Sequence, residues 1–235
     1  MDLFNRLQGI FFNPKLTLKA ISERPVWIDA LIILLIALAL FNYITAPHLQ
    51  KDTLQLLKSS SKLQESLGEE GFNRMIERTE NPSTTSVLIS NFLTKPGALL
   101  VGILFSSLII LVMSRIFSTE GNYKQVFSAI LYANFIDKIL GNALRLVLIL
   151  TRKSFMQTTT SLALFFPKLE VTSSAFIILS QVDFFQLWLF GVLGYGLAAI
   201  FKIELRKGLI LSYSFWALKS LFNIAIGLFS MRLII

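Results

Sequence analysis

Long apolar runs separated by shorter polar segments dominate the chain. The first run, from Trp27 to Ala46, has the uncharged centre LIILLIALALF. About 20 apolar residues in a helix are enough to cross the hydrocarbon core of a bilayer. The pattern therefore predicts five transmembrane helices, at about 27–46, 98–117, 127–150, 178–201 and 208–231.

The first 26 residues have an amphipathic pattern instead. The side opposite Arg6 is apolar and consists of Leu3, Phe4, Leu7, Ile10 and Phe11. This spacing predicts a helix that lies flat in the membrane interface. Asn13-Pro14 then predicts the start of a second short helix, which ends near Glu23.

One sizeable polar segment, 47–87, separates the first two spans. Leucines at helical spacing alternate with polar residues there, and Gly68 interrupts them. We expect an extramembrane helical hairpin near the membrane surface. The fold class is therefore all-α: N-terminal amphipathic helices over 1–26, then a polytopic membrane bundle over 27–235.

Composition agrees with a membrane protein and excludes several kinds of site. The chain is 54% hydrophobic and 15% charged, whereas soluble domains have about 25% charged residues. It has no Cys and one His, His48, so we expect no disulfide, thiolate chemistry or metal centre. The net charge of +8 indicates basic residues facing anionic lipid, and we expect no nucleic-acid partner.

Recognisable catalytic motifs are missing from the sequence. It contains no Gly-x-Ser-x-Gly elbow, P-loop or HExxH motif. The acidic pairs Glu69-Glu70 and Glu77 with Glu80 lie in the predicted hairpin, where a solvated helical face explains them. We therefore expect no enzymatic activity, no catalytic residues and no cofactor.

The distribution of Lys and Arg predicts the orientation. A cytoplasmic N-terminus and an outer C-terminus place a dense basic set in short inner segments, whereas outer segments are longer and more acidic. The compact chain with short termini favours a bacterial inner membrane. The inner basic residues would be Arg6, Lys15, Lys19, Arg24, Arg115, Lys124, Lys202, Arg206 and Lys207.

Three segments have a characteristic order of features: FFNPKLTLKAISERPVW, STEGNYKQVFSAILYANF and LWLFGVLGYGLAAIFKIELRKGLILSYSFWAL. This order resembles the Yip (Ypt-interacting protein) domain family, and especially its bacterial members. In the third span this chain has Asp137-Lys138 where the family often has Pro. The resemblance implies five spans and a cytoplasmic N-terminus. For eukaryotic members it also implies Rab GTPase binding and vesicle traffic.

A polar stripe in the third predicted span is the main candidate site. Ionisable groups at membrane depth are costly and usually face the bundle interior or a water-filled cavity. Matching depths predict two interhelical pairs, Asp137 with Lys219 and Arg145 with Asp183. The stripe either fixes helix packing or lines a cavity for an ion, headgroup or small polar substrate. The candidate residues are Asn134, Asp137, Lys138, Asn142, Arg145, Asp183 and Lys219.

These features favour a non-enzymatic membrane protein that organises or binds other components. The role would lie in trafficking or in lipid or envelope homeostasis, and the expected partners are the lipid bilayer and a protein partner or a second copy. The alternative is a transporter or channel component that uses the polar stripe. A membrane-embedded enzyme acting on lipid is a third, weaker possibility.

Overall fold

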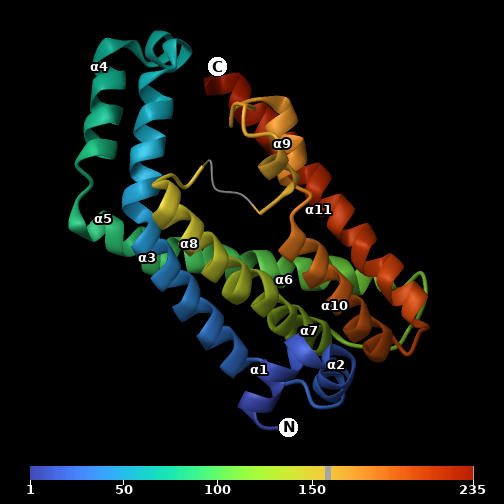
Figure 1. Ribbon diagram of the computed structural model, residues 1–235. Coiled ribbons are helices and arrows are strands. Elements are labelled where there is room, and N and C mark those ends of the chain that lie inside the picture. Colours follow the sequence, from blue (N-terminus) through green and yellow to red (C-terminus); the bar gives the residue numbers. More distant parts are fainter. Residues whose placement is uncertain (157–159, 235) are drawn as a thin grey trace. The chain divides into compact units, whose positions relative to one another are not determined.

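The computed structural model describes residues 1–156 and 160–234 and confirms the all-α fold class (Figure 1). The chain divides into two compact units, each built from several separate segments. Unit 1 comprises 1–38, 96–143 and 184–219. Unit 2 comprises 39–95, 144–183 and 220–235.

Unit 1 packs short N-terminal helices against longer ones. Leu18 and Ile21 of α2 are buried, and α2 packs against both α7 and α10. Gly196 of α10 permits this approach, because a Cβ there would lie 3.3 Å from the Leu18 side chain. The helices of unit 1 are α1 (Leu3–Phe12), α2 (Pro14–Glu23), the first part of α3 (Ile28–Lys58), α6 (Lys95–Ser114), α7 (Tyr123–Phe135), the π-helix η2 (Ile136–Gly141), α10 (Phe184–Phe201) and the first part of α11 (Leu205–Ile234).

Unit 2 contains the hairpin and the segment before α10. Its α4 has no buried residue among those described, and Gly68 interrupts this helix with φ 68° and ψ 166°. Gln50 ties α3 to the end of α4 through hydrogen bonds of 2.9 Å to the carbonyls of Thr79 and Glu80. The helices of unit 2 are the later parts of α3 and α11, α4 (Ser61–Glu80), α5 (Thr84–Ile89), the π-helix η1 (Ser90–Thr94), most of α8 (Asn142–Arg152), the 3₁₀ helix η3 (Leu162–Phe165) and α9 (Ser174–Ser180).

Four helical segments in the described residues are long and apolar enough to cross a membrane: Ile28–Lys58, Thr84–Ser114, Phe184–Phe201 and Leu205–Arg232. They overlap four of the five predicted spans. The third predicted span also lies in a continuous helical segment, over 123–152. That segment contains Asp137, Lys138 and Arg145, and these charged residues lower its mean hydropathy below that of the four helices named above.

Two prolines affect the helices less than the sequence suggests. The first span and the first arm of the hairpin form one helix, α3, that continues through Pro47. Proline followed by glycine usually marks a turn, and from Pro96-Gly97 a helix break is expected just before the second span. That expectation is wrong, because the helix is continuous there and the irregularity is the π-helix η1 just before it. A proline ring clashes with the carbonyl four residues earlier, and a wider turn relieves that clash.

The fourth predicted span, in contrast, is broken. Helix α9 ends at Ser180, and α10 begins at Phe184. Asp183 lies in the break, where it pairs with Ser161 in an isolated antiparallel bridge. A carboxylate directly before a helix N-terminus is favourable because the exposed N–H groups there carry partial positive charge. The polar side chain therefore marks a helix start.

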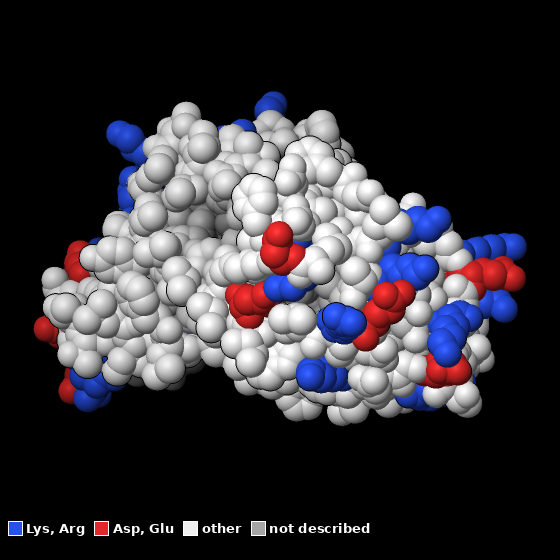
Figure 2. Space-filling view, turned by 90° about the horizontal axis from the view of Figure 1, so that it is seen from below, with Lys and Arg blue, Asp and Glu red and all other residues white. Residues whose placement is uncertain are grey.

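One end of unit 1 gathers segments that the orientation argument places on one side of the membrane. The Ser118 hydroxyl donates to the Phe201 carbonyl at 2.7 Å, and the Gln125 amide donates to the Ser22 carbonyl at 2.7 Å. Lys202 lies 3.3 Å from Glu120. In the view from below, basic and acidic side chains are interspersed on the face that is shown (Figure 2).

Candidate functional site

The seven candidate residues fall into two groups that belong to different units. Unit 1 contains Asn134, Asp137, Lys138, Asn142 and Lys219, whereas unit 2 contains Arg145 and Asp183. The stripe had been expected from regular α-helical spacing, but the π-helix Ile136–Gly141 runs through it. A π-turn inserts extra residues and rotates everything after it.

The first group centres on Asp137, whose residue is 1% exposed. Its carboxylate lies 2.6 Å from the Lys138 ammonium and accepts a hydrogen bond of 2.6 Å from the Gln186 amide. Gln186 in turn accepts a hydrogen bond of 3.2 Å from Lys219. Asp137 and Lys219 were predicted to pair directly; the structure connects them through Gln186, with Lys138 as the ion-pair partner of Asp137.

Asn134 and Asn142 have buried positions on either side of this group. The Asn134 amide donates to the Ile130 carbonyl one turn earlier at 2.8 Å, so part of its polarity is satisfied within its own helix. Lys219 also lies 5.8 Å above the Phe190 ring, a cation–π distance. The group therefore combines buried polar atoms with two lysines of greater exposure.

A pocket of about 220 Å³ adjoins this group within unit 1. Helices α6, α7, α10 and α11 contribute to it, together with η2. Its polar lining residues are Ser106, Asn134, Lys138, Gln186 and Lys219. The apolar lining residues are Ala98, Leu99, Gly102, Ile103, Ile110, Ile130, Leu189, Phe190, Leu193 and Phe215.

The second group, in unit 2, contains the predicted Arg145–Asp183 pair, which is present. One guanidinium nitrogen donates to both Asp183 carboxylate oxygens at 3.1 Å, and the Thr160 hydroxyl donates to the same carboxylate at 2.5 Å. A second guanidinium nitrogen, Nε, donates to that hydroxyl at 3.1 Å. Within unit 2, these bonds join α8 to the turn that follows α9.

A third polar network was not predicted. Arg6 lies on the packed side of α1, where it forms an ion pair with Asp29 and donates to the Tyr132 hydroxyl at 2.7 Å. That hydroxyl donates to Asp29 at 3.0 Å. The helical pattern had placed Arg6 opposite the apolar side of an interfacial helix, whereas the apolar side chains of Phe4 and Phe12 are exposed. The sequence feature that could have indicated this network is Asp29, an acidic residue at the start of the first span that could serve as a partner for Arg6.

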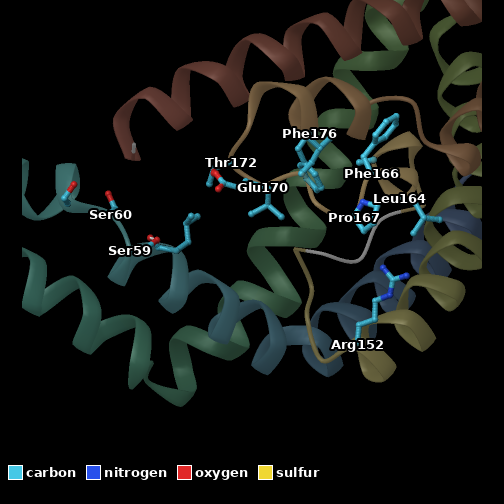
Figure 3. A pocket seen from close by; sticks show the side chains of 14 residues that line it. Ser59, Ser60, Arg152, Leu164, Phe166, Pro167, Glu170, Thr172 and Phe176 are labelled. Atoms are coloured by element: carbon cyan, nitrogen blue, oxygen red, sulfur yellow. The ribbon is translucent and has the colours of Figure 1, made fainter.

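A larger pocket of about 900 Å³ lies in unit 2 (Figure 3). Ser59 and Ser60 line it on one side, and Phe166, Glu170 and Phe176 belong to a different segment. The labelled polar side chains come from several directions and do not converge on one point (Figure 3). No three metal-ligating side chains are grouped in the described part of the chain.

Comparison with known proteins identifies one family. The sequence profile of the Yip1 domain matches residues 9–227, which include nearly all the helices described above. Neither the curated proteins nor the solved structures contain a match to this chain.

Proposed function

We propose that this multi-pass integral membrane protein, which belongs to the Yip1 domain family across residues 9–227, acts as a non-enzymatic organising subunit in the membrane. Its role would lie in trafficking or in lipid or envelope homeostasis, with the bilayer and a protein partner or second copy as its contacts. Fold does not determine function, so the family alone does not name the partner.

The observation that carries the proposal is that ionisable side chains of the helical core bond to one another. The Arg6–Asp29–Tyr132 network joins α1, α3 and α7. Arg145 and Asp183 join two further segments of unit 2. Polar groups used in this way fix helix packing, whereas a catalytic site needs groups directed at a reacting molecule.

The alternative function, a transporter or channel component, has one observation in its favour. Lys138 and Lys219 both line the 220 Å³ pocket, whose charge an ion or polar substrate could neutralise. Ionisable residues at membrane depth often mark such pathways. The two functions make different predictions for one double variant.

We expect Asp137→Asn combined with Lys219→Met to leave the protein folded and still associated with its partner. The tagged chain would be purified from native membranes with and without the substitutions, and copurifying proteins identified. Both forms should retain the same partner, because Asp137 is buried and Lys219 is bonded within unit 1 to Gln186. A protein that purifies alone, and whose ion or solute flux in proteoliposomes disappears in the folded double variant, would be a transporter.

Orientation is part of the proposal, with the N-terminus cytoplasmic and the C-terminus outside a bacterial inner membrane. The converging end of unit 1 supports it, because the segments at Ser22, 118–125 and 201–202 contact one another and the sequence beside each is rich in Lys and Arg. Short segments rich in Lys and Arg remain on the cytoplasmic side. These residues include Lys15, Lys19, Arg24, Arg115, Lys124, Lys202, Arg206 and Lys207.

Single cysteines introduced into this cysteine-free chain test the orientation directly. In intact cells, a membrane-impermeant maleimide should label Glu69→Cys and Lys168→Cys. It should label Lys19→Cys and Lys207→Cys only after the membrane is permeabilised. All four positions are exposed, so accessibility depends on the side of the membrane. The opposite labelling pattern would reverse the proposed topology.

A further inference from the structure

The pocket in unit 1 has a net positive charge on its polar side. Lys138 and Lys219 both line it, whereas the Asp137 carboxylate beside Lys138 does not. Two ammonium groups and one carboxylate leave one formal positive charge. Among the described residues Lys219 is bonded to the neutral Gln186 and faces the Phe190 ring, with no carboxylate within ion-pair distance. Such a lysine in an apolar helix is costly without an anion.

The lining changes character along the helices. Gln186 and Leu193 are seven residues apart on α10, or roughly 10 Å at 1.5 Å per residue. Lys138 and Ile130 are similarly separated on the α7–η2 segment. The lysines and Gln186 therefore lie toward one end of the pocket, and Ile110, Ile130 and Leu193 toward the other. The pocket is an apolar channel with a cationic end.

We infer that this pocket binds a single anionic group attached to an apolar chain, with the anion between Lys138 and Lys219 and the chain along the apolar lining. The chemistry is that of a fatty-acid carboxylate or the phosphate of an anionic phospholipid. Ammonium groups form their strongest hydrogen bonds with such ionised oxygens.

The size of the pocket limits the ligand. Pockets for drug-sized molecules measure about 300–1,000 Å³, and this one measures about 220 Å³. It can therefore accept one narrow chain with a compact anion, and any remaining part of a phospholipid would lie outside it. This ligand site is distinct from the organising role, since binding can be measured on the purified chain without a partner.

Binding to the full-length protein in a nonionic detergent would be measured by native mass spectrometry and by the ligand-induced rise in thermal midpoint. The probes are decanoate, 1-decanol, short-chain phosphatidylglycerol, short-chain phosphatidylcholine and inorganic phosphate. Decanoate and phosphatidylglycerol should bind one per chain and more tightly than their uncharged or zwitterionic counterparts. Inorganic phosphate, which has no chain, should bind weakly.

Two variants alter the pocket in independent ways. Lys138→Gln with Lys219→Gln removes both positive charges and leaves the Asp137 carboxylate. It should weaken binding at least about tenfold, as expected for at least one lost charge-assisted hydrogen bond. Gly102→Leu should weaken binding similarly, because the leucine side chain would fill the channel. The protein should still fold, since a Cβ at Gly102 meets nothing within 4 Å and leucine has a higher helix propensity than glycine. Lys207→Gln, an exposed lysine on α11 outside the pocket, is the matched control.

The outcomes separate the possibilities. Tighter binding of phosphatidylglycerol would identify a lipid headgroup as the anion, and tighter binding of decanoate a free fatty acid; either supports the inference. Equal binding of decanol and decanoate would overturn it, as would equal binding of inorganic phosphate and phosphatidylglycerol. It would also be overturned if the double lysine variant behaved like Lys207→Gln, or if Gly102→Leu bound ligand normally.

Discussion

Asp183→Ala should destabilise the protein by about 3–5 kcal/mol, the usual cost of removing one partner from a buried ion pair. The side chains of Arg145 and Asp183 are 18% and 11% exposed, so solvent screens their charges only partly. The substitution leaves the guanidinium and the Thr160 hydroxyl without their shared acceptor. For a chain of this length the thermal midpoint falls by about 2–4 °C per kcal/mol, so detergent-solubilised protein should show a large shift.

A surface ion pair in the same unit provides the control. Arg74 and Glu70 are 3.5 Å apart, with side chains 64% and 85% exposed. Pairs of this kind contribute about 0–1 kcal/mol, and Glu70→Ala should barely change the midpoint. Combining Arg145→Met with Asp183→Ala should cost less than the sum of the two single changes, because the unpaired charge is gone. A midpoint for Asp183→Ala as high as for Glu70→Ala would contradict the pairing.

Gly208→Ala should also destabilise the protein, although alanine is the better helix former. A Cβ at Gly208 would lie 2.5 Å from the Gly194 carbonyl oxygen and 3.0 Å from the Ala198 backbone nitrogen. Backbone atoms cannot rotate away, so α10 and α11 would have to separate. Overpacking of this kind costs about 1–3 kcal/mol, which thermal unfolding in detergent would detect.

Gly97→Ala is the matched substitution for this test. Gly97 is also inside a helix, in α6, and a Cβ there meets nothing within 4 Å. The alanine should therefore raise the free energy of unfolding by about 1 kcal/mol at most, through its helix propensity. The thermal midpoint should rise slightly as a result. If both substitutions raised the midpoint equally, α10 and α11 would not be in close contact at Gly208.

The apolar runs are sufficient to predict the all-α fold, because a bilayer requires nearly continuous apolar helices and their lengths are readable in the sequence. The Arg145–Asp183 pair is predictable for a related reason. Counting residues from the ends of two antiparallel spans gives similar depths, and isolated charges at such depths require partners.

Other features depend on packing that residue spacing does not describe. Gln186 is neutral and one of many polar residues, so its position between Asp137 and Lys219 has no sequence signal. Arg6 was assigned to the wrong side, because a helical pattern does not show which face meets a neighbouring Asp29. The π-helix η2 changes the direction in which the side chains after it point around the helix axis. No single residue in the sequence indicates such a turn.

Helix α4 has a practical consequence that follows from its lack of buried residues. A segment that buries no side chain adds little to the folding free energy and opens locally at low cost. At Gly68, where the backbone is non-helical and a Cβ would meet nothing within 4 Å, extra chain has room to leave the helix. This glycine is therefore a suitable point for inserting a reporter domain, such as a fluorescent protein, without disturbing the packed helices.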